Sequence, residues 1–142
     1  MSSSSAICVD ANLVIRNVDP DRTLSVAEVW RGLARERTEL HAPALLRYEV
    51  INTVHRMRRA GRLSAEEAGR ALTRVFRLPI TMHNDDALQL RAYQLATEHG
   101  LPATDDANYL AVAERLGVEL WTLDAKLFKA VGERLPWVRL VG

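Results

Sequence analysis

The stretch Ile7-Cys8-Val9-Asp10-Ala11-Asn12-Leu13-Val14-Ile15 places one carboxylate, Asp10, between two apolar runs. A continuous apolar run of this kind is typical of a strand that is buried on both faces. We therefore expect Asp10 where a first strand ends and a helix begins. Open α/β sheets bind their ligands at the carboxyl ends of parallel strands. Asp10 is therefore the first residue that we expect to line an acidic metal pocket.

The size and composition of the chain fit one globular domain. Its 142 residues are 48% hydrophobic and 26% charged, with a formal net charge of +1. This is enough apolar material for one core, and a charge so near zero neither demands nor forbids a nucleic-acid partner. We expect a single domain over residues 1–142, with a flexible tail at residues 1–5.

The chain shows no signal for secretion or membrane insertion. Its Ser-rich start lacks the basic and apolar segments of a signal peptide, and no apolar run approaches the ~18 residues of a membrane span. The single cysteine, Cys8, lies inside the expected first strand and fits a reducing compartment. We expect a cytoplasmic protein without membrane contact.

Strand and helix patterns alternate along the rest of the chain. Further short strands are expected near residues 39–42, 79–82, 118–123 and 137–141. Helices are expected near residues 24–37, 44–59, 64–77, 86–98 and 105–116, with a last short one around 127–128. Ser64 and Glu67 have the spacing of a capping box, and Thr104 is expected to cap the helix that follows it. The alternation predicts an α/β fold, a three-layer α/β/α sandwich around a mainly parallel sheet of four to five strands.

A second acid, Asp124, has the same local pattern as Asp10. It follows the apolar stretch 118–123 and precedes a short helix. Parallel strands end at the same edge of a sheet and lie ~4.8 Å apart, so the two carboxylates converge if the first and fourth strands are neighbours. The alternative for each is a helix N-cap, a frequent role of Asp. Two such acids together favour the pocket.

Two further positions complete the candidate acidic set. Glu49 interrupts a helix that is apolar around most of its circumference, and no basic residue lies three or four positions away. Glu98 and Glu114 also lack such partners, so an acid at the edge of the apolar face is the alternative. Asp105 and Asp106 open a helix, where the helix dipole favours acids whatever their function, and spacing does not choose between them.

This set of residue types indicates a hard cation. Carboxylates without a convincing Cys or His cluster select Mg²⁺ or Mn²⁺ over Zn²⁺, and the four histidines are scattered at the edges of expected elements. A divalent cation among carboxylates can activate water and stabilise the leaving oxygen of a phosphodiester. A basic run beyond Glu49 is a candidate contact for the RNA backbone, with a solvated helix end or an acidic protein partner as alternatives. Its arginines are Arg56, Arg58, Arg59 and Arg62.

From Ile7 to Leu140 the chain resembles the PIN-domain nucleases, and more narrowly the VapC-type toxins of prokaryotic toxin-antitoxin pairs. Four stretches carry the resemblance: Val9-Asp10-Ala11-Asn12, Ala44-Leu45-Leu46-Arg47-Tyr48-Glu49-Val50, Asp106-Ala107-Asn108-Tyr109-Leu110-Ala111-Val112-Ala113 and Thr122-Leu123-Asp124. The third, with its Asp-Ala-x-Tyr-Leu-Ala form, is the most specific. It selects Asp106 over Asp105 as the site acid.

The resemblance implies an endoribonuclease that uses Mg²⁺ or Mn²⁺. The catalytic and metal-binding quartet that it selects is Asp10, Glu49, Asp106 and Asp124. It also implies that Asn12, where many relatives carry Ser or Thr, and Thr122 orient the acids or their water. The implied partners are an RNA substrate, a cognate antitoxin and a second copy of the chain.

A function of another class also fits an acidic pocket. The chain would then be a non-catalytic module that binds a metal for structure or accepts a phosphoryl group. The sequence has no acid adjacent to Asp10 and no convincing lysine after a late strand, which counts against phosphoacceptance.

Overall fold

Five parallel strands form one sheet in the computed structural model, which describes residues 5–142. The strands are β1 (Ala6–Val9), β2 (Glu39–Pro43), β3 (Ile80–His83), β4 (Glu119–Thr122) and β5 (Val138–Leu140). Their order in the sheet is β3-β2-β1-β4-β5, and all four pairings are parallel. The predicted parallel sheet is confirmed, and β1 and β4 are neighbours.

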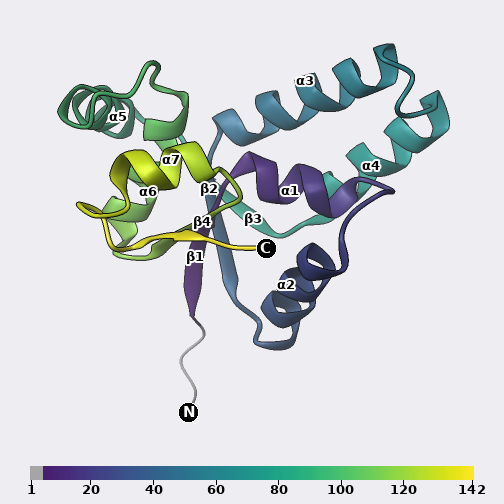
Figure 1. The fold of residues 1–142 in the computed structure, drawn as a ribbon, viewed down its shortest axis with the longest axis horizontal. Helices are drawn as coiled ribbons and strands as arrows, with labels where there is room; N and C mark the ends of the chain where they lie inside the picture. Colours follow the sequence, from purple (N-terminus) through teal and green to yellow (C-terminus); the bar gives the residue numbers. More distant parts are fainter. Residues whose placement is uncertain (1–4) are drawn as a thin grey trace.

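Helices cover both faces of this sheet. They are α1 (Ala11–Val18), α2 (Leu24–Arg35), α3 (Leu45–Arg59), α4 (Ala65–Arg77), α5 (Asp86–Glu98), α6 (Asp105–Leu116) and α7 (Ala125–Val131). Figure 1 shows α5 and α6 on one side of the strands and α1 to α4 on the other. Because α6 contacts β1, β2 and β4 while α1 contacts β4, the result is the expected three-layer sandwich.

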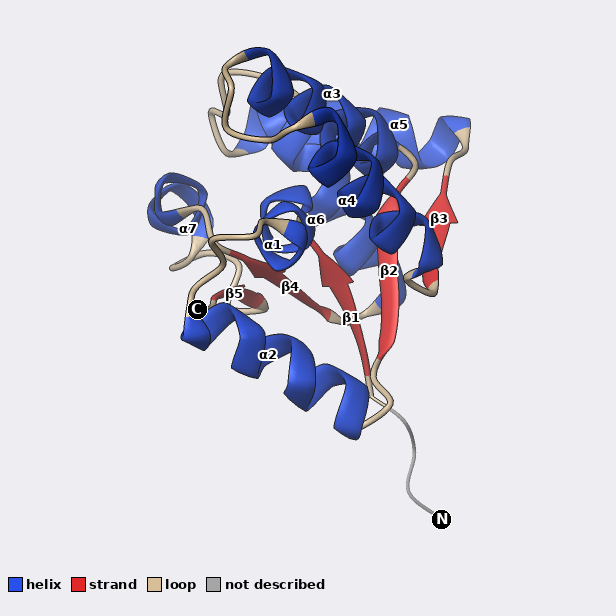
Figure 2. Cartoon of the chain, turned by 90° about the vertical axis from the view of Figure 1, so that its right-hand side faces the viewer, coloured by secondary structure: helices blue, strands red, loops and turns tan. Residues whose placement is uncertain are grey.

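The central strand and the helix behind it are the most buried parts of the core. Ile7, Cys8 and Val9 of β1 are buried, as a strand covered on both faces requires. On α6 the residues from Tyr109 to Ala113 are all buried, because this helix is enclosed between α5 and the sheet. Figure 2, turned by 90°, shows β1 in the middle of the sheet, between β2 and β4.

Local sequence signals explain several of the helix ends. The capping box at Ser64 and Glu67 is present in full, and Gly117 ends α6 in the left-handed conformation with φ 66°. The prediction for Thr104 is wrong. Its backbone is helical, with φ −88° and ψ −5°, so its side chain makes no capping hydrogen bond. Asp85 does cap α5 by accepting from the Leu88 amide at 2.9 Å.

Of the expected flexible tail, only Ser5 lies within the described range. Residues 1–4 lie outside the described range. The Ser5 carbonyl accepts a hydrogen bond from the Glu39 amide at 2.8 Å, and its hydroxyl pairs with that of Thr38 at 3.3 Å. Ser5 therefore extends the pairing of β1 with β2.

Among the described helices, none has the length and apolarity needed to cross a bilayer.

Candidate active site

Two of the predicted acids lie directly beyond neighbouring strands. Asp10 follows β1, and its amide donates to the Trp121 carbonyl of β4 at 3.0 Å, which continues the ladder between the two strands. Asp124 follows β4 two residues after Thr122. Since β1 and β4 are parallel neighbours, both acids belong to the same edge of the sheet.

The Asp10 carboxylate is buried and held by two polar side chains. Asp10 is only 5% exposed and Thr122 is fully buried. The Thr122 hydroxyl donates to Oδ2 of Asp10 at 2.7 Å. The Asn12 side-chain amide lies 3.4 Å from the same oxygen and 3.2 Å from Oγ1 of Thr122, while its Oδ1 accepts from the Leu123 amide. Asn12 and Thr122 thus fix the orientation of Asp10 across the β1 and β4 ends.

Asp10 and Asp124 differ in their relation to the following helix. Oδ1 of Asp124 accepts from the amides of Lys126 and Leu127 at 2.9 and 3.2 Å, so Asp124 caps α7. Asp10 occupies the N-cap position of α1 but its side chain makes no capping hydrogen bond. Helix capping therefore accounts for the role of one oxygen of Asp124, and it does not account for the position of Asp10.

Glu49 enters the same region from α3 and is held by a tyrosine. The Tyr109 hydroxyl donates a short hydrogen bond to Oε1 of Glu49. Tyr109 is buried on α6, three residues after Asp106, so this contact joins α3 to α6. Sequence reasoning assigned no role to Tyr109. The available signal was that a buried tyrosine hydroxyl needs a hydrogen-bond partner.

The electrostatics show that the predicted acids share one region. Burial raises the pKa of Asp10 to about 7, against the Thr122 hydrogen bond and with help from the charges of Asp106 and Glu49. Burial also raises the pKa of Glu49, opposed by Tyr109 and assisted by Asp105 and Asp106.

Asp106 connects this group to Asp124. Burial is the main cause of its raised pKa, and the charges of Asp124 and Asp105 add to it. The structure therefore places the four acids of the quartet, with Asp105, within range of one another's charges. Asp105 and Asp106 occupy the first turn of α6.

Among residues 5–142, no basic side chain forms an ion pair with these acids. The ion pairs of the described residues involve other acids, among them Asp19, Glu66, Asp85, Glu98, Glu114 and Glu119. Within residues 5–142 none involves Asp10, Glu49, Asp105, Asp106 or Asp124. The acidic end of the sheet therefore keeps an excess of negative charge that burial makes costly.

The arginines of the basic run lie away from the acids. Arg59 is ten residues beyond Glu49 on α3, which corresponds to roughly 15 Å along the helix axis. Arg62 pairs with Asp19 at 3.2 Å. Figure 1 shows that this end of α3 points away from the strand ends. The run and the acidic end are thus separate surfaces.

Two histidines are paired, although the sequence presented all four as scattered. Nδ1 of His41 and Nε2 of His83 lie 3.0 Å apart, because β2 and β3 are neighbours. Nε2 of His41 also lies 3.5 Å from Oε1 of Glu39. These two histidines lie on β2 and β3. The donors at the acidic end are therefore carboxylate oxygens.

The acidic end fits a hard divalent cation by its chemistry. Its donors are carboxylate oxygens that raise one another's pKa values, and a bound cation would relieve that repulsion. Within the described residues, no three His, Cys, Asp or Glu side chains are already grouped closely enough to hold a metal ion by themselves. Proteins often hold Mg²⁺ through one or two carboxylates while water or a phosphate supplies the other ligands.

Comparison with known proteins gives the family. The model of the PIN domain matches residues 7–134. The chain is 32% identical over 123 residues to a protein of Pyrobaculum aerophilum named Ribonuclease VapC3, covering 85% of this chain and 91% of the relative.

Solved structures share the fold. The crystal structure of PAE2754 from Pyrobaculum aerophilum superposes with a TM-score of 0.67 at 27% identity, over 89% of this chain and 84% of that one. A toxin-antitoxin complex from Klebsiella pneumoniae contains a chain with a TM-score of 0.64 at 19% identity, and 96% of each chain is covered. The family match over most of the chain, with the fold and acidic end described above, shows that this protein belongs to the PIN domain family.

Proposed function

We propose that this protein is a divalent-cation-dependent endoribonuclease that acts in the cytoplasm as the toxin of a toxin-antitoxin pair. The observation that carries the proposal is the group of uncompensated carboxylates at the ends of β1 and β4. Several acids are drawn into a partly buried region without one basic partner among the described residues, at a cost that a purely structural role does not require. The name of the Pyrobaculum relative, Ribonuclease VapC3, supports the same activity.

The quartet Asp10, Glu49, Asp106 and Asp124 is assigned to catalysis and metal binding. A divalent cation, Mg²⁺ or Mn²⁺, would bind a phosphate oxygen and lower the pKa of a water molecule. Asp10 is presented in one orientation by Thr122 and Asn12. Tyr109 does the same for Glu49. Asp124 uses one oxygen to cap α7, and its Oδ2 accepts no hydrogen bond from the described residues.

The protonation of Asp10 sets a condition for this chemistry. Its raised pKa of about 7 means that, without a cation, a large fraction of Asp10 is protonated near neutral pH. A bound cation favours the ionised form, so cation binding and proton release are coupled. Activity is therefore expected to rise as pH increases through neutrality.

The arginines at the far end of α3 are assigned to the flanking RNA. Arg56, Arg58 and Arg59 are exposed, and none of the three makes an ion pair within the described residues. Their distance from the acids suits phosphates several nucleotides away from the cleaved bond. Replacing Arg58 and Arg59 by Ala is expected to weaken RNA binding more strongly at low salt than at high salt.

The proposed protein partners are a cognate antitoxin and a second copy of the chain. The neighbour from Klebsiella pneumoniae was solved as a toxin-antitoxin complex. Co-expression with the product of an adjacent short gene, followed by purification of a stable complex, tests the first partner. Sedimentation of the purified chain tests the second. Failure to form a complex would leave a ribonuclease without this antitoxin, and a monomer in sedimentation would refute the second partner.

An RNA cleavage assay tests the proposed activity. Purified protein with Mg²⁺ or Mn²⁺ is expected to cut single-stranded RNA internally, and EDTA is expected to stop it. Asp10→Asn should lose the activity, whereas Asp86→Asn, an exposed acid in the first turn of α5, should keep it. Equal cleavage by the wild type and Asp10→Asn, or cleavage that persists in EDTA, would refute the assignment.

A further inference from the structure

A hollow adjoins the acidic end. It has a volume of about 450 Å³, within the ~300–1,000 Å³ typical of ligand sites. It lies where the starts of α3, α5 and α6 meet the end of β3. Tyr48, the chain neighbour of Glu49, and Asp105, the chain neighbour of Asp106, both line it. The hollow and the acidic end are therefore adjacent, since each of these lining residues is one position from an acid of the quartet. One ligand can reach both.

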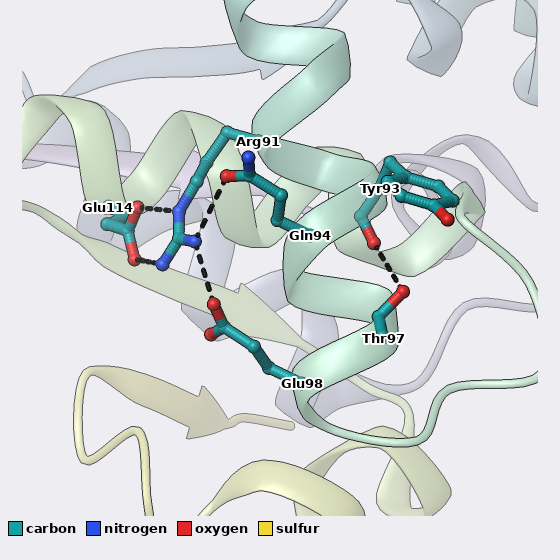
Figure 3. Close-up of polar contacts among 6 residues, drawn as sticks. All are labelled: Arg91, Tyr93, Gln94, Thr97, Glu98 and Glu114. Atoms are coloured by element: carbon teal, nitrogen blue, oxygen red, sulfur yellow. Dashed lines mark hydrogen bonds and ion pairs between the residues drawn. The ribbon is translucent and has the colours of Figure 1, made fainter.

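Two exposed tyrosines line the hollow from different helices. Tyr48 of α3 is 74% exposed and Tyr93 of α5 is 62% exposed. Neither hydroxyl makes a hydrogen bond within residues 5–142. Figure 3 shows the Tyr93 ring on the side of α5 away from the ion pairs of Arg91. One exposed aromatic residue is ordinary on a protein surface, but two that line one hollow beside a nuclease site suit a flat, stackable ligand.

The polar lining of the hollow is rich in hydrogen-bond acceptors. The Gln89 side-chain amide donates to Oδ1 of Asn84 at 2.9 Å, and that of Asn108 donates to the Thr104 carbonyl at 2.8 Å. These contacts leave Oε1 of Gln89 and Oδ1 of Asn108 without a donor in the described part of the chain. The lining contains Asp105 but no Arg or Lys. Such a lining repels a phosphate and suits a group that donates hydrogen bonds.

We propose that this hollow is a nucleobase subsite for an unpaired base of the RNA, preferentially one that carries an exocyclic amino group. Tyr48 and Tyr93 provide stacking surfaces, and the acceptor oxygens of Gln89 and Asn108 receive the amino hydrogens. The inference rests on the proposed ribonuclease function, because the phosphodiester at the acidic end brings the base to the hollow. A base inside a duplex cannot enter, so the subsite predicts a single-stranded substrate.

Binding without cleavage tests the subsite separately from the activity. Fluorescence anisotropy of a labelled single-stranded RNA octamer is measured for the wild type, Tyr48→Ala, Tyr93→Ala and their Phe counterparts. Ca²⁺ replaces Mg²⁺, so that the acidic end can still hold the phosphodiester, and a gel checks that the octamer stays intact. Each Ala variant is expected to bind about 5- to 100-fold more weakly, and each Phe variant nearly as well as the wild type. The matched control is Leu90→Ala, because Leu90 is 59% exposed on α5 and lies outside the hollow. It should bind like the wild type.

Base analogues test the acceptor lining. Replacing adenosine by purine riboside, which lacks the amino group and keeps the stacking surface, is expected to lower the affinity of an adenosine octamer severalfold. Equal affinity of the two octamers would overturn the preference for an amino group. Equal affinity of the wild type and both Tyr→Ala variants would overturn the subsite itself.

Two further measurements separate this inference from its alternatives. Sedimentation of the Tyr→Ala variants is expected to match the wild type. A shift of both variants to a smaller species would identify the hollow as a contact between copies of the chain and overturn the subsite. If the wild type cleaves RNA and the tyrosine variants bind it normally, only the subsite fails. If the wild type binds RNA through the tyrosines but never cleaves it, the ribonuclease function fails.

Discussion

The two ends of α6 carry acidic clusters that the protein treats in opposite ways. At its start, Asp105 and Asp106 join the acids of the sheet edge without a basic partner among the described residues. Near its end, Glu114 meets the Arg91 guanidinium through two hydrogen bonds of 2.7 and 3.0 Å, and Glu98 binds the same group at 3.0 Å. Figure 3 shows these two acids converging on Arg91.

The difference appears directly in the pKa values. Hydrogen bonding to Arg91 lowers the pKa of Glu114, and the pairing with Arg115 lowers that of Asp85. Burial raises the pKa of both Asp10 and Asp106, and neighbouring carboxylates raise them further. One cluster is complete in the protein alone. The other has no basic partner among the described residues, and under the proposed function a cation takes that place.

The strongest way to break this comparison is to neutralise one acid in the uncompensated cluster. Asp10→Asn keeps the shape of the side chain and removes its charge. We expect RNA cleavage to fall by about 100-fold or more, since loss of the groups that merely orient a metal ligand already costs about 10- to 100-fold. Glu98→Gln, the matching change in the compensated cluster, should leave the cleavage rate within about twofold. A normal rate for Asp10→Asn would remove the distinction between the two clusters.

The pH dependence of stability tests the same contrast without RNA. The folded-state pKa of Asp10 is raised from 3.8 to about 7. In that window the folded protein holds a proton that the unfolded chain releases, so stability falls as pH rises. At about 1.4 kcal/mol per pKa unit, the raised pKa of Asp10 lowers the free energy of unfolding by about 4 kcal/mol across this pH window.

Urea unfolding in EDTA measures this contribution. The wild type and Asp10→Asn are compared between pH 4 and 8. Asp10→Asn is expected to lack this loss of stability. The free energy of unfolding of the variant, relative to that of the wild type, should therefore increase with pH up to about 7. Parallel stability curves for the two proteins would show that Asp10 is not held in the raised state.

A smaller effect is expected from the tyrosine that orients Glu49. Tyr109→Phe keeps the buried ring and removes the hydrogen bond to Oε1 of Glu49. Cleavage should slow by about 10-fold, and the cation concentration for half-maximal activity should rise. The unfolding free energy should fall by only about 1 kcal/mol. Unchanged cation dependence would reduce Tyr109 to a packing residue.

The smallest effect is expected in the compensated cluster. Arg91→Ala leaves Glu98 and Glu114 without their shared partner, but all three side chains are at least one-third exposed. The stability loss should therefore be below about 1 kcal/mol and should shrink further in high salt. Cleavage should be unchanged. Thermal unfolding at two salt concentrations, together with the cleavage assay, measures both outcomes.

The sequence predicted the parts of this contrast that depend on local pattern. Asp10 and Asp124 each follow an apolar strand and precede a helix, and the parallel sheet that the alternation predicted brings β1 and β4 together. The capping box of Ser64 and Glu67 is equally local, since both partners lie within one helical turn. Such features can be predicted from the sequence because local backbone geometry determines them.

The remaining contacts depend on how distant segments pack. Glu98 and Glu114 lack basic residues three or four positions away, but Arg91 lies seven and 23 positions from them and reaches both. The hydrogen bond of Tyr109 to Glu49 spans 60 positions. Spacing rules for one helix cannot find contacts between helices. For that reason the sequence did not predict the pairing of Glu98 and Glu114 with Arg91 or the contact of Tyr109 with Glu49.

Cation binding tests the central claim most directly. Mn²⁺ is titrated into the wild type, Asp10→Asn and Asp86→Asn, and the unbound ion is followed by electron paramagnetic resonance. The wild type and Asp86→Asn should bind Mn²⁺ alike, whereas Asp10→Asn should bind at least about 10-fold more weakly. Indistinguishable binding by the wild type and Asp10→Asn would contradict the claim that the uncompensated acids at the ends of β1 and β4 form a cation site.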